Sequence, residues 1–270
     1  MRFAVTGVFL CALLLAPAGA SAQYRGVPFS DPATGEVYHV EVAGAIWNPT
    51  PEMTVSSEAL GIIGSDIDVV GDLGIEKKSL RELRVVLRPA RKHKFRIHYL
   101  PMHYTADATV TREFVFNGLR YRVGLPVSTS FEWDNWRLGY EYDFLYRDRW
   151  FVGLVVEAKY TDVKVDLDSA IGTEFTHARA PIPAVGGIVR GYVAPNISVT
   201  FEMTGIKLPE SINEDYRAHY IDWDLYGTVN FSDNAGVQFG YRSLDVGYKF
   251  ELDTGDFKIK GIYFGGVVRF

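Results

Sequence analysis

The chain has 270 residues, of which 47% are hydrophobic and 14% aromatic, with a formal net charge of −5 and a pI near 5.7. This acidic balance argues against nucleic acid as a partner, because nucleic-acid sites are built from clustered basic side chains. Beyond the first 22 residues, no stretch approaches the ~20 consecutive apolar residues of a transmembrane helix.

Residues 1–22 are predicted to form a secretory signal peptide. Arg2 supplies a short positive region, an apolar stretch follows, Pro17 breaks it, and a small-x-small cleavage site ends at Ala22. We therefore expect export and cleavage after Ala22. A retained N-terminal anchor helix is the alternative.

The sole cysteine, Cys11, lies inside this segment. The mature chain then lacks the thiols for disulfides, thiol catalysis or cysteine-ligated metals. Residues 23–36 are expected to be a flexible periplasmic lead, and residues 37–270 a single domain. An exported, aromatic-rich chain of average hydropathy is either a secreted β protein or a transmembrane barrel.

Apolar and polar residues alternate through most of the mature chain, and a period of two indicates strands with one apolar and one polar face. In residues 221–231, for example, Trp223 and Leu225 share one parity while Asp222 and Asp224 share the other. We predict about ten strands, with eight to twelve possible, beginning near Val37, Ser79, Phe95, Trp133, Trp150, Pro181, Ile197, His219, Gly236 and Phe257.

Short and long links alternate between these strands, which is the topology of an outer-membrane barrel with periplasmic turns and extracellular loops. The long links are placed at 49–78, 105–130, 166–179 and 209–217. An even number of strands puts both termini on the periplasmic side. The predicted fold is an all-β, transmembrane, antiparallel up-and-down barrel.

Two segments affect the strand count. Residues 61–74 have strand-like composition and are placed in the first long loop, as an extension above the membrane. Residues 111–124 are expected to form a hairpin that turns at Asn117-Gly118, a strong hairpin dipeptide. Its arms either extend the third and fourth strands or form two additional crossings, which gives twelve.

The polar parity carries acids and bases in equal number, and a narrow lumen can pair them. A solvated surface can balance its charges too. The inward acids are predicted to be Glu41, Glu82, Glu141, Asp143, Glu157, Glu202, Asp222 and Asp224, and the inward bases Arg84, Arg88, Arg96, Arg137, Lys159, Arg190, Arg242 and Arg269.

Aromatic residues of the apolar parity are expected at two levels, as in the interfacial girdles of membrane barrels. The lower level comprises Phe95, Phe144, Tyr146, Trp150, Phe231 and Phe270. The upper level comprises Trp47, Trp136, Tyr160 and Trp223.

The last residues, with Tyr263, Gly265, Val268 and the terminal Phe270, resemble the C-terminal assembly signal of bacterial outer-membrane barrels. The resemblance implies recognition by the barrel-assembly machinery. An ordinary buried final strand is the alternative.

Residues 240–248, GYRSLDVGY, resemble the Gly-Tyr-Arg-x-Leu-Asp-Val segment of many uncharacterised bacterial outer-membrane β-barrel proteins, which implies a fold class and no activity. Arg242 and Asp245 have opposite parity. A β-bulge near Ser243 would be needed to point both inward.

Catalytic constellations are weak. Omptin-type proteases use acidic pairs and a histidine, and Asp222, Asp224 and nearby His219 resemble such a set. The second Asp-x-His element of that family is missing from this sequence. Lipid A deacylases use a serine and a histidine, and neither His98 nor His103 has a serine partner at strand spacing. No metal, cofactor or catalytic residue is predicted.

We therefore expect a monomeric outer-membrane protein whose partners are outer-membrane lipid and the assembly machinery. A closed barrel that works through its extracellular loops is the preferred function; a narrow porin-like channel for small polar solutes is the alternative, and a rim hydrolase is less favoured. The candidate lumen network is Arg84, Arg96, Arg137, Glu141, Asp143, Glu157, Arg190, Asp222, Asp224 and Arg242.

Overall fold

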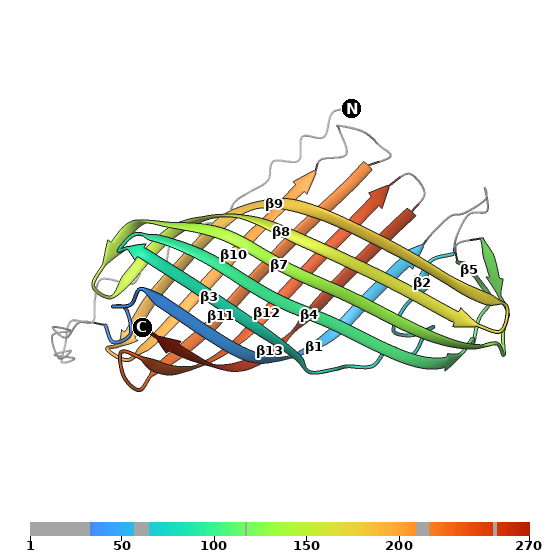
Figure 1. Cartoon of the computed structure of the whole chain (residues 1–270), viewed down its shortest axis with the longest axis horizontal. Helices are drawn as coiled ribbons and strands as arrows, with labels where there is room; N and C mark the ends of the chain where they lie inside the picture. Colours follow the sequence, from blue (N-terminus) through green and yellow to red (C-terminus); the bar gives the residue numbers. More distant parts are fainter. Residues whose placement is uncertain (1–32, 57–64, 117, 209–215, 251–252) are drawn as a thin grey trace, which may run out of the picture. The chain divides into compact units, whose positions relative to one another are not determined.

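The structure is a computed structural model that describes residues 33–56, 65–116, 118–208, 216–250 and 253–270. In these residues ten long antiparallel strands form one sheet, and pairing of the first strand with the last closes it into a barrel (Figure 1). The barrel strands are β1 (Val40–Ser56), β3 (Leu80–Ala90), β4 (His93–Thr109), β7 (Pro126–Arg147), β8 (Trp150–Ser169), β9 (Gly172–Ala194), β10 (Ile197–Leu208), β11 (Tyr216–Asn230), β12 (Ala235–Phe250) and β13 (Asp253–Arg269).

This architecture confirms the predicted closed antiparallel barrel of ten strands. Short turns join β3 to β4, β7 to β8, β9 to β10 and β11 to β12 at the end of the barrel that holds Phe270. We call this the short-turn end and the opposite one the long-loop end. No helix in the described part of the chain is long and apolar enough to cross a membrane.

Three short strands accompany the ten long ones, and one of the three is part of the barrel sheet. β2 (Ile67–Asp68) pairs with the end of β1 and lies in the first long link, where the sequence placed residues 61–74; residues 61–64 lie outside the described residues. β5 (Phe114–Phe116) and β6 (Leu119–Tyr121) pair with one another in a sheet of their own. The hairpin therefore neither extends the third and fourth barrel strands nor crosses the membrane. Gly118 in its turn has a φ of 80°, a value that favours glycine.

The strands are longer than predicted. β7 has 22 residues and β9 has 23, whereas a transmembrane strand needs about 9–11. The expected starts at Trp133 and Pro181 were therefore too late. The expected long link at 166–179 is mostly strand, because β8 and β9 continue to a tight turn between Ser169 and Gly172.

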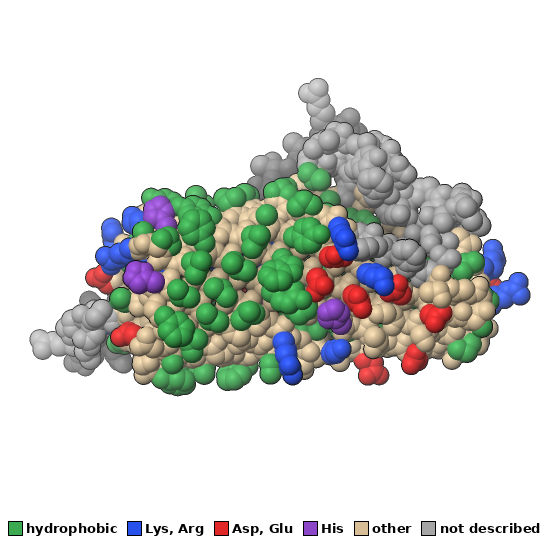
Figure 2. Space-filling model, viewed as in Figure 1, with side chains coloured by type: hydrophobic (Ala, Val, Ile, Leu, Met, Phe, Trp, Pro, Cys, Tyr) green, Lys and Arg blue, Asp and Glu red, His purple; other side chains and the backbone are tan. Residues whose placement is uncertain are grey.

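The outer surface changes character along the barrel. Near the short-turn end, outward side chains are apolar and exposed, such as Phe95 at 50% and Ile97 at 37% on β4. Farther along the same strand and parity, His103 and Thr105 replace them. Figure 2 shows the same division, with hydrophobic side chains gathered near the short-turn end and charged ones beyond them. We call the exposed apolar region the apolar belt.

The inner surface changes at the same level, but there charged residues give way to apolar ones toward the long-loop end. The inward parity of β4 begins with Lys94, Arg96 and His98, all buried, and continues with Leu100, Met102 and Tyr104, also buried. Near the short-turn end the barrel is thus apolar outside and charged inside, as in a membrane. Beyond the apolar belt it is polar outside and apolar inside, as in a water-soluble barrel.

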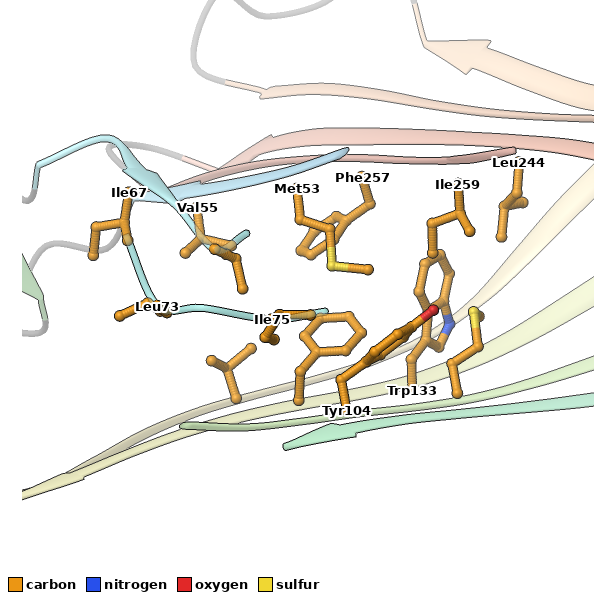
Figure 3. Close-up of a cluster of buried hydrophobic side chains, with 14 of the residues drawn as sticks. Met53, Val55, Ile67, Leu73, Ile75, Tyr104, Trp133, Leu244, Phe257 and Ile259 are labelled. Carbon is orange, nitrogen blue, oxygen red and sulfur yellow. The ribbon is translucent and has the colours of Figure 1, made fainter. Parts of the chain in front are cut away.

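The apolar interior of the long-loop half is a single packed cluster (Figure 3). Wall residues such as Met53, Trp133 and Phe257 meet side chains from the link after β2, including Leu73 and Ile75. Phe131 and Trp133 lie against Phe257, with ring centroids 5.6 and 5.9 Å apart. Leu73 and Ile75 of the first long link therefore point inward and occupy part of this end of the lumen.

The aromatic levels are largely as predicted, with two corrections. Trp136, 41% exposed, stacks on Tyr99 at the outer edge of the apolar belt. Trp47 is instead fully buried in the lumen, because it shares its parity with inward Glu41. Tyr146 accepts a hydrogen bond from Arg88 and packs on Phe151, because a register shift between residues 142 and 145 of β7 reverses the parity there.

Candidate functional site in the barrel lumen

Arg137 on β7 is the centre of the charged interior. Its Nη1 donates to Asp222 Oδ2 on β11 at 2.8 Å, and its Nη2 donates to Glu202 Oε1 on β10 at 2.9 Å. The same guanidinium lies 3.1 Å from Glu157 Oε2 on β8. Lys159 Nζ adds contacts of 3.0 Å to Glu157 and 3.4 Å to Asp222. One arginine thus joins three acids from three other strands.

A second centre is Arg242 on β12. It donates to Glu82 on β3 and, at 2.8 Å, to Asp224 Oδ2 on β11. Arg84 lies 3.7 Å from the same carboxylate oxygen. Tyr263 on β13 donates its hydroxyl to that oxygen at 3.1 Å. Residues of these two centres, together with Arg96 and His98, form what we call the ion-pair network.

Arg96 on β4 connects this network to a third group nearer the short-turn end. It donates to Glu202 and lies 3.2 Å from Glu141 Oε2. Lys94 Nζ lies 2.6 Å from Glu141 and 2.9 Å from Asp143. Charges of opposite sign therefore alternate across the lumen through several layers.

The residues before β1 close the short-turn end. Glu36, at the end of the predicted lead, is buried and accepts from Arg190 at 3.0 Å and from the Tyr192 hydroxyl at 2.9 Å. Thr34 donates its backbone N–H to the Pro195 carbonyl at 2.8 Å. Burial raises the pKa of Glu36, but the positive charges of Arg190 and its neighbours outweigh this, and the pKa lies below its usual value.

All ten residues of the candidate lumen network are buried side chains of the interior. The ion pairs described here include every one of them, and Glu82, Glu202 and Lys159 complete the pairing. Sequence reasoning assigned these three inward but left them out of the candidate set. It missed Lys94 and Glu36 altogether; Lys94 shares its parity with Arg96, a signal that the sequence does contain.

The space between the charged groups is very small. A cavity of about 10 Å³ lies among Arg84, Arg96, His98, Arg137, Glu157, Glu202, Asp224 and Arg242. This is about the volume of a single water probe. The ion-pair network therefore fills the cross-section of the lumen.

The histidines do not gather around the acidic pair. His98 lies 3.1 Å from Glu82 inside the lumen. His219 is part-buried on the outward parity of β11, 2.9 Å from Asp245 Oδ1. Within the described ranges, no group of residues could hold a metal ion.

Each of the two C-terminal motifs has residues that point into the lumen and residues that point outward. Arg242 points inward while Asp245 points outward to His219 and Lys258. β12 pairs with β11 without a register shift, so the bulge near Ser243 is absent from the described ladder. In the last strand Tyr263 faces the lumen, whereas Val268 and Phe270 are exposed at 44% and 70%.

An apolar cavity of about 420 Å³, which we call the upper cavity, lies beyond the network toward the long-loop end. Trp133, Val163, Val165, Phe257 and Tyr220 line it from within the barrel. Ala180, Pro181, Ile182, Pro183, Ile206, Leu208 and Ala218 line it at the wall between β9, β10 and β11.

The wall is unpaired at this place. The β9–β10 ladder ends at Val185 and Gly205, although β10 continues to Leu208 and β9 begins at Gly172. Pro181 and Pro183 explain why the ladder stops, because proline has no N–H to donate. We call the unpaired stretch, residues 180–184 against 206–208, the β9–β10 seam.

The β8–β9 ladder shows toward which neighbouring strand the nitrogens of Pro181 and Pro183 point. Tyr192 donates its N–H to Arg149 on the β8 side at 2.8 Å, and the β8–β9 register runs unbroken from Gly191 to Gly172. Alternate residues of an antiparallel strand point their N–H groups to opposite neighbours. Pro181 and Pro183 have the other parity, so their nitrogens face β10.

No protein-family model and no curated protein matches the chain. Among solved structures, the outer membrane protease OmpT from Escherichia coli aligns with a TM-score of 0.55 and 7% identity, over 90% of this chain and 100% of that chain. The toluene transporter TodX from Pseudomonas putida aligns with a TM-score of 0.36 and 8% identity over 89% and 92% of the two chains. Ail, the attachment invasion locus protein of Yersinia pestis, aligns with 0.37 and 9% over 86% and 99%.

The similarity to OmpT, at this identity, shows the fold alone. The chain has the fold of the bacterial outer-membrane β-barrels, as its alternation and its even strand number predicted.

Proposed function

We propose that this protein is a monomeric outer-membrane barrel that is closed to diffusion and acts through its extracellular half. The observation that carries the proposal is the ion-pair network, which leaves a cavity of only about 10 Å³ across the lumen. The short-turn end then faces the periplasm and the apolar belt contacts outer-membrane lipid. The barrel-assembly machinery inserts the chain through its last strand.

The packing of the long-loop end supports the same proposal. Leu73 and Ile75 from the first long link and Phe114 and Phe116 from the β5–β6 hairpin are buried in the apolar cluster. These segments fix the extracellular surface of the barrel. A rigid surface suits binding to a partner, because little conformational entropy is lost when it is contacted.

Proteolysis receives no support from the acidic pair. Asp222 is bound by Arg137 and Lys159, and Asp224 by Arg242. A carboxylate that activates water needs free access to that water. His219 points to the outer surface, on the parity opposite to that of the two acids.

Single-channel recording in planar bilayers tests the closed barrel. Wild type, Arg137→Ala and the exposed control Arg120→Ala are refolded in detergent, and heat-dependent gel mobility verifies each barrel first. We expect wild type and Arg120→Ala to be silent despite verified insertion. Discrete openings of the wild type, with conductance altered by Arg137→Ala, would instead establish the narrow channel.

A further inference from the structure

The upper cavity is large enough for a small molecule. Its volume is about 420 Å³, within the range of about 300–1,000 Å³ that is usual for ligand pockets. An engineered apolar cavity of about 150 Å³ already binds benzene. The lining is almost wholly apolar, so a ligand here must be mainly hydrocarbon.

The upper cavity reaches the wall at the β9–β10 seam, where Pro181, Pro183 and Leu208 line it. Leu208 has the inward parity of β10 and yet is 44% exposed, because the wall beside it is unpaired. Ile182, opposite it in the continued register, is part-buried. The ion-pair network closes the route along the barrel axis from the short-turn end to the cavity. Among the described residues, the seam is where the cavity comes nearest to the apolar belt.

The seam lies at the outer edge of the apolar belt. Below it, Val185 and Met203 are exposed at 64% and 44%. At its own level Tyr160 pairs with Pro181, and one step above it Arg179 lies 2.8 Å from Asp162. A molecule dissolved in the membrane would therefore meet the opening where hydrocarbon gives way to polar groups.

One polar group in the cavity wall lacks a partner. Trp133 is 1% exposed, and its Nε1–H finds no acceptor among the described residues. A buried donor without an acceptor is unfavourable, because it has lost its hydrogen bond to water and gained none in the protein. Trp133 is also one of the residues that line the upper cavity.

We propose that the upper cavity binds a small lipophilic molecule that carries a hydrogen-bond-accepting oxygen, and that this molecule enters from the membrane through the β9–β10 seam. The oxygen accepts from Trp133 Nε1–H, and the hydrocarbon body fills the apolar space. This binding function goes beyond the closed barrel, since a barrel without any ligand would be equally closed.

The test uses the full mature chain in lipid nanodiscs and the probe Prodan, an apolar naphthalene that carries one ketone. We expect saturable binding with one probe per barrel, seen as blue-shifted probe emission above that of empty nanodiscs. Trp133→Phe keeps the apolar ring and removes the donor, so the dissociation constant should rise about twofold to tenfold, the net worth of one hydrogen bond.

Two further variants separate cavity from surface. Ala218→Phe fills the lining and should abolish saturable binding, whereas Ile221→Phe, outward on the same strand, should leave it intact. If Ala218→Phe loses its heat-dependent gel mobility, Ile206→Phe replaces it. Equal binding by wild type and a folded cavity-filling variant, or no saturable binding by wild type, would overturn the proposal.

The seam and the source of the ligand have their own measurements. Pro181→Thr with Pro183→Thr restores two donors toward β10 and should slow both association and dissociation of Prodan; unchanged rates would overturn entry through the seam. Two competitors of Prodan distinguish the sources of the ligand. If a free long-chain ketone displaces the probe, the ligand is a free lipophile. If added phospholipid displaces it, the ligand is an acyl chain with its ester. Conductance is recorded separately, so failure of this proposal leaves the closed barrel standing.

Discussion

Arg137 on β7 and Asp222 on β11 meet across the lumen, with Nη1 and Oδ2 2.8 Å apart and β8, β9 and β10 between them in the wall. Both side chains are buried, at 7% and 4% exposure. The wall at this level is therefore held together by contacts through its interior as well as by its ladder of backbone hydrogen bonds.

Arg137→Ala should destabilise the barrel strongly, because three buried acids lose a common partner. Breaking a buried ion pair from one side typically costs about 3–5 kcal/mol. Guanidinium unfolding in detergent, followed by tryptophan fluorescence, measures the change. Arg120→Ala, which removes an exposed pair with Glu113, should leave the midpoint almost unchanged; equal effects of the two variants would show that the lumen pairs add no stability.

Gly186 on β9 should not tolerate alanine. A Cβ at this position would lie 1.9 Å from the Met203 carbonyl oxygen, a backbone atom of β10. The strands must separate to admit it, which costs about 1–3 kcal/mol by analogy with overpacked cores. Gly191 on the same strand has open space at the equivalent point, so Gly191→Ala is the matched control. The yield of heat-resistant barrel compares the two.

Docking of the segment before β1 should depend on pH. The pKa of Glu36 is lowered in the folded protein, so its contribution is fully present above its unfolded pKa and is lost as pH falls through the lower folded value. Hydrogen exchange at Thr34, corrected for its intrinsic pH dependence, should accelerate in acid.

Glu36→Gln has nearly the same shape and cannot ionise. We expect its exchange at Thr34 to be faster than wild type at neutral pH, with a much weaker response to acid. A wild-type acid response that persists unchanged in Glu36→Gln would assign the effect to another group.

Trp133 and Trp136 should report the edge of the membrane. Trp136 is 41% exposed on the apolar belt, and Trp133 is 1% exposed inside the barrel. Variants that retain one tryptophan are reconstituted in lipids with brominated acyl chains. Emission from Trp136 should be quenched strongly and emission from Trp133 weakly; the reverse order would contradict the assigned faces.

Lumen charges could be predicted because the face of a strand residue follows from its parity, and the strand number because links separate the alternating runs. Arg137, Glu141 and Asp143 share one parity on β7, and a closed sheet puts every residue of that parity on one side. Trp47 could have been placed in the same way, since it lies six positions after Glu41 and so has the same parity. Tyr146 could not, because the register shift in β7 has no clear sequence signal.

The upper half of the barrel was misread for a physical reason. Above the apolar belt the inward parity becomes apolar and the outward parity polar, which is the arrangement of a barrel surrounded by water. Leu100 and Met102 continue the parity of Arg96 and His98, so on one face of the strand apolar residues follow charged ones. The seam was missed as well, although Pro181 and Pro183 mark an unpaired strand edge.

Glu41 and Arg269 lie opposite one another where the first strand meets the last, with 2.6 Å between Oε2 and Nε. A slip of one residue at this junction would turn one strand's inward side chains toward lipid. Each such error would carry an arginine or a glutamate into hydrocarbon and leave its partner alone in the interior. The observed closure pairs the two charges, so this ion pair favours the correct register where the ends of the sheet meet.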